Sequence, residues 1–164
     1  MAAPHSPLHH PGRPAATPGC GWTPVQGAHD ELAHLHLQLR SAPEAAGEGR
    51  HALDRLEGLL NQDQLAELRL LVTELLTNSI RHGTRPGDWI TLDVDIYANA
   101  VRVAVTDRGP GFQRRPDPEP NRDRPGGWGL CLVDRLADRW GVNSGAGTSV
   151  WFEIDRHGHF AAAA

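Results

Sequence analysis

The chain has 164 residues and a formal net charge of −4, and 39% of its residues are hydrophobic, so it can form one domain of ordinary size with a real hydrophobic core. All 16 basic residues are arginines, which excludes mechanisms that require a lysine, such as a P-loop or a Schiff base. Every acidic residue falls at or after Asp30, and an acidic body of this kind disfavours binding to nucleic acid.

The cysteines and the hydropathy pattern bear on the compartment. Cys20 and Cys131 lie far apart in different contexts, which favours neither a disulfide framework nor a zinc site. No apolar run approaches the roughly 20 residues that span a bilayer, and the N-terminus lacks the basic and apolar regions of a signal peptide. We therefore expect a cytoplasmic protein that does not enter a membrane.

The first thirty residues are rich in Pro, Gly, Ala and His, and their prolines are spaced too closely for a helix or a strand. We predict a disordered tail over 1–30, a folded domain over 31–155 and a frayed C-terminus over 156–164. Three histidines of the tail are His5, His9 and His10. They have no accompanying Cys or acidic cluster, so the sequence favours a polar tail over a metal site.

The stretch HLHLQLR, residues 34–40, alternates strictly and predicts a half-buried strand. The inward positions are Leu35, Leu37 and Leu39. His34 and His36 then face the other side together. They could chelate a metal, but the pattern favours solvated strand positions or part of a partner surface.

The sequence SAPE after this strand predicts the start of a helix. Ser41 is placed to cap it, and Glu44 could reach back from the third helical position. Apolar residues at helical spacing then carry the helix forward to Leu60.

A second helix, opening at Asn61 or Asp63 and stopping at Gly83, contains the most informative pair of residues. Glu74 and Asn78 are four residues apart, so they point the same way from one helix face. An apolar stripe formed by Leu68, Val72, Leu75 and Leu76 borders this face. The pair indicates a site, and the alternative is a buried face with satisfied polar groups.

Two alternating runs with a tight link at Asn99 predict an antiparallel hairpin. The second run ends in DRGPGF, where Asp107 shares the inward parity of the preceding valines, and an inward carboxylate needs a partner. Gly109 and Gly111 allow a sharp turn and the close approach of a ligand. Without a ligand, Asp107 could instead cap the Gly109 turn.

The remaining chain combines an irregular loop with a glycine-rich helix start. Residues 113–125, here called the lid, have no periodicity, and a loop of this length inside a domain is usually functional. The stretch GGWGLCLVDRLADRW places glycines before a helix, where backbone N–H groups bind phosphate well. A turn over 143–147 then leads into a strand from Thr148 to Ile154.

The order of these motifs closely resembles the GHKL ATPase superfamily, the ATP-binding fold shared by gyrase, MutL, heat-shock chaperones and histidine kinases. Within it, ELLTNSIRHG, VTDRGPGF, GGWGLCLVDRLADRWGV and GTSVWFEI look most like small anti-sigma factor serine/threonine kinases. The resemblance covers about Leu35 to Ile154. It implies a Bergerat fold: an α+β two-layer sandwich with three helices on one face of a mixed, mostly antiparallel sheet of four to five strands.

The resemblance also implies roles for the motif residues, with ATP and Mg²⁺ as cofactors. Asn78 would ligate Mg²⁺ through its carbonyl oxygen, and Glu74 would be the catalytic general base. Asp107 would accept a hydrogen bond from the adenine amino group, with Gly111 against the base and Thr148 nearby. The implied nucleotide-binding set is Asn78, Asp107, Gly109, Gly111, Gly127, Gly129, Leu130 and Thr148.

Two features of the glycine-rich region bear on phosphate chemistry. The lid arginines could neutralise the γ-phosphate or could simply be solvated; they are Arg114, Arg115, Arg122 and Arg124. Trp128 stands between two glycines where relatives commonly carry Arg or another polar residue. A phosphate contact is then lost, or a partner contact is gained.

The function that the resemblance implies is a cytoplasmic serine/threonine kinase of the partner-switching type. It would phosphorylate a small anti-sigma antagonist and alternately sequester a sigma factor, and relatives are often homodimers. The alternative is a non-catalytic ATP-dependent binding module whose lid exposes or hides a protein-binding face. Trp151 and Glu153 face away from the apolar set of the last strand, as a partner surface or as a cover for the sheet edge.

Overall fold

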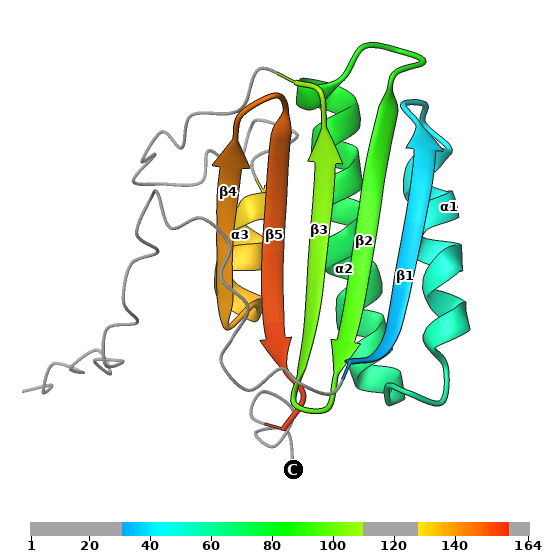
Figure 1. Cartoon of the computed structure of the whole chain (residues 1–164), viewed down its shortest axis with the longest axis vertical. Helices are drawn as coiled ribbons and strands as arrows, with labels where there is room; N and C mark the ends of the chain where they lie inside the picture. The colour runs from blue at the N-terminus through cyan, green and yellow to red at the C-terminus, as the bar shows by residue number, and fades with distance from the viewer. Residues whose placement is uncertain (1–30, 110–127, 158–164) are drawn as a thin grey trace, which may run out of the picture.

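The computed structural model describes residues 31–109 and 128–157, whose strands form one five-stranded sheet (Figure 1). The strands are β1 (Glu31–Arg40), β2 (Trp89–Tyr97), β3 (Ala100–Asp107), β4 (Arg139–Ser144) and β5 (Thr148–Asp155). Their order across the sheet is β1-β2-β3-β5-β4. Every pairing between these strands is antiparallel, so the described sheet has none of the parallel pairs that a mixed sheet would contain.

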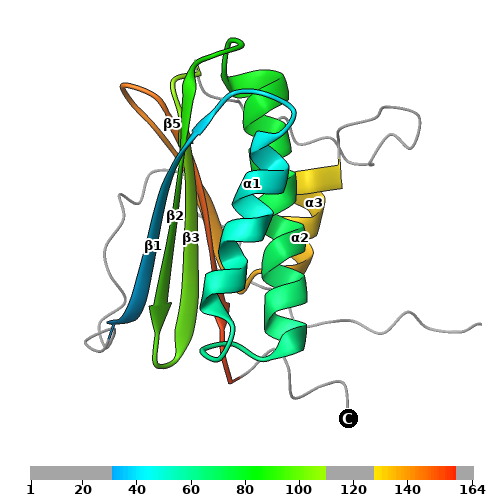
Figure 2. The ribbon, with the colours of Figure 1, turned by 90° about the vertical axis from the view of Figure 1, so that its right-hand side faces the viewer.

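The helices lie on one face of this sheet, as Figure 2 shows. They are α1 (Ala45–Ala52), the short 3₁₀ segment η1 (Leu53–Leu56), α2 (Gln62–Asn78), the π-helical turn η2 (Ser79–Gly83) and α3 (Trp128–Leu136). No helix of the described residues covers the opposite face, which we call the outer face. The predicted α+β two-layer fold is confirmed.

The core fills the space between the two layers. Alternate positions of the strands point toward the helices, and the fully buried side chains of α2 meet them. The largest of these buried side chains are Phe152, Leu53, Leu65, Leu68, Leu71, Leu75, Leu76, Ile90, Leu92, Ile96, Val72 and Val94. The predicted stripe of α2 is therefore confirmed as the face that joins helix to sheet.

The start predicted for the first helix is wrong. The helix α1 begins at Ala45 with Glu44 at its N-cap, and no side chain caps it. Ser41 is instead bonded to the segment that leads into β2, because its amide donates to the carbonyl of Asp88 at 2.7 Å. Its hydroxyl is directed to that of Thr84, 2.5 Å away, and not to the helix end.

The predicted extent of this helix is also wrong. The helical run stops at Leu56, at the end of η1, instead of at Leu60. Gly58 follows with φ of +91°, a left-handed conformation that only glycine adopts easily and that breaks the helix. Leu59 consequently points outward and is 36% exposed.

Of the two predicted starts for α2, Asn61 is confirmed. The side chain of Asn61 accepts from the amide of Gln64 at 2.9 Å, and the side chain of Gln64 accepts from the amide of Asn61 at 2.9 Å. This reciprocal capping box satisfies two amides that the helix leaves unpaired. At the other end, the amide of Thr84 donates to Ser79 at 3.0 Å and closes η2, so the helical run ends at Gly83 as predicted.

One strand, β4, is absent from the sequence prediction. Its residues RWGVNS carry a glycine and polar residues, and they follow the helix so closely that the helical pattern masks them. Their strand conformation comes from pairing with β5, for example Trp140 with Phe152 and Val142 with Val150. This pairing is a long-range property that local periodicity does not reveal.

The outer face carries paired charges. His34 lies 2.5 Å from Asp95, and this hydrogen bond raises the pKa of His34 above its usual value. Nδ1 of His36 lies 2.6 Å from a carboxylate oxygen of Asp93. Both histidines are on the outer face, as the alternation predicted.

Trp151 and Glu153 on β5 also face outward. The indole of Trp151 is partly buried against Gly141 of the edge strand, and the guanidinium of Arg102 lies 5.0 Å from the ring centre. Glu153 is buried and pairs with Arg139. Of the two alternatives for these residues, the packing favours a cover for the sheet edge.

Arg156, which the sequence placed in the frayed terminus, is anchored by several hydrogen bonds. Its guanidinium donates to the carbonyl of Tyr97 at 2.7 Å and to that of Leu59 at 2.6 Å. Its own carbonyl accepts from the side chain of Gln64 at 3.1 Å. Arg156 therefore ties the end of β5 to the β2–β3 turn and to the start of α2. The tail 1–30 and residues 158–164 lie outside the described residues.

Two glycines of α1 provide a stability test. A Cβ at Gly49 would overlap the buried side chain of Leu76, whereas a Cβ at Gly47 meets nothing within 4 Å. We expect Gly49→Ala to lower the free energy of unfolding by about 1–2 kcal/mol, because a filled core resists an added methyl. Gly47→Ala should raise it by about 0.5–1 kcal/mol through helix propensity. Urea unfolding measures both, and equal gains would show that Leu76 moves aside freely.

Candidate functional site

The C-terminal end of β3 holds a buried carboxylate. Asp107 is only 6% exposed and pairs across the sheet with Thr148 of β5. Its Oδ1 accepts from the amide of Gly109 at 2.8 Å, and the hydroxyl of Thr148 donates to the carbonyl of Gly109 at 3.2 Å. The turn-capping bond that the sequence allowed is therefore present, and it uses one carboxylate oxygen. No described residue donates a hydrogen bond to the other, Oδ2.

Three glycines make this arrangement sterically possible. A Cβ at Gly83 would overlap the carboxylate of Asp107, and a Cβ at Gly109 would overlap the backbone of Gly83. A Cβ at Gly147, in the β4–β5 turn, would overlap the carbonyl oxygen of Asp107. The end of η2, the end of β3 and the β4–β5 turn thus meet at backbone contact distance. We call this place the Asp107 corner.

Like Gly147, Gly83 belongs to this corner but is not among the predicted site residues. The sequence assigned it only as the stop of the second helix, which it is. Its second role depends on a contact with Asp107, 24 residues later in the chain, and no local pattern signals that contact. A glycine that ends a helix just before a strand pair was the only available hint.

Glu74 and Asn78 lie on one face of α2, as predicted, and both side chains are partly exposed. Neither makes a hydrogen bond or an ion pair with another described residue. The pair therefore does not belong to a buried helix face. Asn78 is the last residue of α2, and η2 continues directly from it to Gly83 beside Asp107. One helical run thus connects the polar pair to the Asp107 corner.

An open hollow of about 580 Å³ lies beside this corner. Its lining, among the described residues, is His82, Gly83, Thr84, Arg85, Asp88, Arg108 and Gly109. Glu74, Asn78 and Thr148 are not part of that lining. The hollow therefore adjoins the Asp107 corner, but it does not by itself join the corner to the polar pair of α2.

The remaining predicted site residues divide into two groups. Gly129 and Leu130 lie in the first turn of α3, and Leu130 is half-buried against the core. The amides at such a helix start are available to an anion. Gly111, Gly127 and the lid arginines lie outside the described residues.

Comparison with known families gives one match that covers most of the chain. A model of the histidine kinase-like ATPase domain matches residues 39–154 of the chain. Among the described residues, none of the helices contains an apolar stretch that could span a bilayer.

Curated relatives point to one group within that family. The chain is 30% identical over 125 residues to the serine-protein kinase RsbW of Listeria innocua, covering 67% of this chain and 77% of the relative. It is 24% identical over 134 residues to the anti-sigma F factor of Anoxybacillus flavithermus, covering 75% of this chain and 91% of the relative. The similarity to RsbW-type anti-sigma kinases is a distant homology.

A solved structure shows the same fold. The crystal structure of the RsbU and RsbW domains of a Mycobacterium tuberculosis protein superposes with a TM-score of 0.57 at 22% identity. The match covers 76% of this chain and 32% of that one. At this identity the likeness concerns the fold, which supports the Bergerat architecture.

The packing at the Asp107 corner predicts that alanine substitutions at Gly83 and Gly145 have different effects on stability. We expect Gly83→Ala to lower the free energy of unfolding by about 1–3 kcal/mol, because the new methyl must displace a buried carboxylate. Gly145→Ala, in the β4–β5 turn with nothing within 4 Å, should stay within about 0.5 kcal/mol of the parent protein. Urea unfolding measures both values. If both variants unfold like the parent protein, the contact between Gly83 and Asp107 is not tight.

Proposed function

Because the chain belongs to the histidine kinase-like ATPase domain family, we propose that it binds ATP with Mg²⁺ and acts as an anti-sigma factor-type serine/threonine protein kinase. The observation that carries the nucleotide site is Asp107, a buried carboxylate with one oxygen that no described residue bonds. An acceptor of this kind, in a side chain that is largely buried, is placed to receive a hydrogen bond from a ligand donor. The amino group of adenine supplies that donor.

This acceptor also supports a choice between purines. Guanine presents a carbonyl oxygen where adenine has its amino group, and two acceptors facing each other repel. A site built to receive a hydrogen bond rejects the base that cannot donate it, because the buried group is then left unpaired. Thr148 supports the base site from the neighbouring strand, and in this proposal Gly111 would lie against the base.

The polar pair of α2 supports the metal and catalytic roles. The carbonyl oxygen of Asn78 has no described partner, and Mg²⁺ takes few protein oxygens together with phosphates and water. Bound Mg²⁺ would neutralise charge on the phosphates. Glu74 lies one turn earlier on the same face, where a carboxylate can accept the proton of the attacking serine or threonine hydroxyl.

Phosphate binding is assigned to the start of α3. The amides of Gly127 and Gly129 would bind the phosphates there, next to Leu130. Arg114, Arg115 and the other lid arginines would add positive charge near the γ-phosphate.

The partners in this proposal come from the named relatives, a serine-protein kinase and an anti-sigma factor. The substrate is a serine or threonine of a small anti-sigma antagonist, and the protein alternately binds a sigma factor. In this proposal it acts in the cytoplasm and can form a homodimer. The rival function is a non-catalytic ATP-dependent binding module. Trp128 favours that rival, because it stands in the glycine-rich stretch where relatives commonly carry a polar residue.

The nucleotide site is tested by Asp107→Asn. We expect ATP affinity to fall by about 10- to 100-fold, because a hydrogen bond to a charged acceptor contributes about 1.5–3 kcal/mol. The parent protein should also bind GTP much more weakly than ATP. Isothermal titration with Mg²⁺ present measures these affinities, and Asp63→Asn on the exposed first turn of α2 is the control. Unchanged ATP affinity in Asp107→Asn would remove the basis of the nucleotide site.

The catalytic role is tested by Glu74→Gln with γ-labelled ATP and the antagonist-like proteins of the same genome. Removing a general base should slow label transfer to serine or threonine by about 10²- to 10⁴-fold while ATP affinity changes little. Glu48→Gln, an exposed carboxylate of α1, should transfer at the parent rate. ATP binding without transfer by the parent protein would reject the kinase and favour the binding module.

A further inference from the structure

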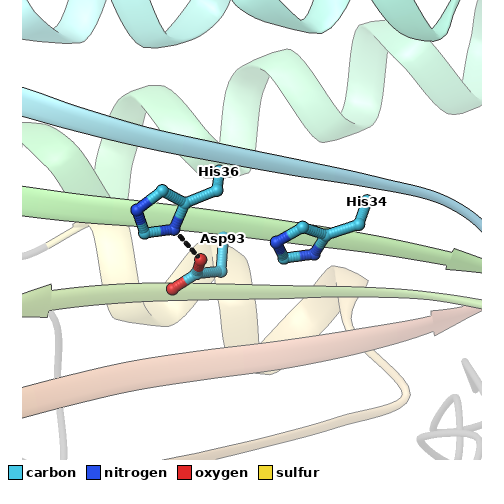
Figure 3. Close-up of side chains that lie close together, drawn as sticks. All are labelled: His34, His36 and Asp93. Carbon is cyan, nitrogen blue, oxygen red and sulfur yellow. Dashed lines mark hydrogen bonds and ion pairs between the residues drawn. The ribbon is translucent and has the colours of Figure 1, made fainter.

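We propose that the outer face of the sheet carries a binding site for a divalent transition-metal ion, formed by His34, His36 and Asp93 and supported by Asp95 (Figure 3). The site lies on β1 and β2, on the side of the sheet that no described helix covers. It therefore does not involve the Asp107 corner or the polar pair of α2.

Strand geometry brings these four side chains together. His34 and His36 are two residues apart on β1, so both rings leave the same face, with ring centres 6.3 Å apart and planes within 20° of parallel. The antiparallel register places Asp95 opposite His34 and Asp93 opposite His36. Cross-strand neighbours of this kind have Cβ atoms about 5 Å apart, which suits a shared ligand.

The hydrogen bonds divide the roles among the four residues. Nδ1 of His34 lies 2.5 Å from Asp95, so its N–H donates there and its other nitrogen, Nε2, keeps a lone pair. Figure 3 shows that nitrogen directed toward Asp93. His36 presents Nδ1 to Asp93 at 2.6 Å. A bound ion would replace this hydrogen bond, because His36 and Asp93 are both ligands of the proposed site, whereas the bond between His34 and Asp95 would remain. A carboxylate that holds the far nitrogen of a ligating histidine is the usual support of a protein metal site.

The ligand atoms are close enough together that binding an ion would require only small movements of these side chains. One ligand atom from each of His34, His36 and Asp93 lies within 4.8 Å of the other two. A tetrahedral ion with bonds of about 2.1 Å needs its ligands about 3.4 Å apart. The histidine side chains are 46% and 51% exposed, so small rotations can close this difference without disturbing the core.

The ligand set selects the class of ion. Two imidazoles and one carboxylate suit Zn²⁺, Ni²⁺, Co²⁺ or Cu²⁺, whereas Mg²⁺ prefers oxygen ligands. The exposed position leaves the remaining coordination sites to water. A bound ion would connect the edge strand β1 to β2, and it would stabilise the folded state by binding to it alone.

The experiment is isothermal titration of the full chain with Zn²⁺, without nucleotide and with excess Mg²⁺ to occupy oxygen-rich sites. The tail histidines are competing ligands, so the matched control replaces His5, His9, His10 and His29 with Gln. We expect this control to keep one Zn²⁺ site. Replacing His34 and His36 with Gln should weaken that site by at least tenfold, with circular dichroism confirming the fold.

Asp95→Asn separates this arrangement from adventitious binding to exposed histidines. It leaves all three ligands in place, yet it should weaken Zn²⁺ binding by about 10- to 100-fold because His34 loses its support. Co²⁺ spectra without a thiolate charge-transfer band would exclude the cysteines as ligands. The proposal is overturned if Zn²⁺ binds the His34/His36 variant as it binds the parent, or if no site tighter than millimolar remains once the tail histidines are replaced.

Discussion

The close contact between Gly83 and Asp107 is the constraint on which the candidate nucleotide site depends. A carboxylate can be buried at the end of β3 only if its oxygens find donors or room, and Gly109 supplies one donor. The absence of a side chain at Gly83 supplies the room. The absence of one at Gly147 allows the β4–β5 turn to contact the backbone of Asp107 at the end of β3. Three backbone segments that are distant in sequence therefore meet around one charged group.

The helix α2 connects this corner to the hydrophobic core. Its apolar positions, such as Leu71 and Leu75, are buried against the sheet and hold the helix at a definite distance and rotation. The same rotation brings Glu74 and Asn78 to the border of the core, where they are partly exposed and have no described partner. Core packing thus orients the two polar side chains, which is the kind of rigid support that a site needs.

The two faces of the sheet differ in polarity and in what covers them. The inner face is apolar up to Asp107, and the helices cover it. The outer face carries cross-strand pairs such as His34 with Asp95 and Arg139 with Glu153, which keep the face compatible with water while satisfying its charges. The proposed kinase site and the proposed metal site are therefore separated by the thickness of the sheet, and each can be tested without disturbing the other.

The sequence by itself determined the elements whose signals are local: the alternation of β1, β2, β3 and β5, a start of α2 at Asn61 or Asp63, the polar face of α2 and the inward position of Asp107. These follow from periodicity and capping, which need only neighbouring residues. The tertiary structure alone decided that β4 is a strand, that Ser41 bonds Thr84 instead of capping a helix, and that Gly83 lies against Asp107. It also placed Asp93 and Asp95 across from His36 and His34. Such contacts join residues far apart in the chain, and their energy arises only when the sheet and helices pack.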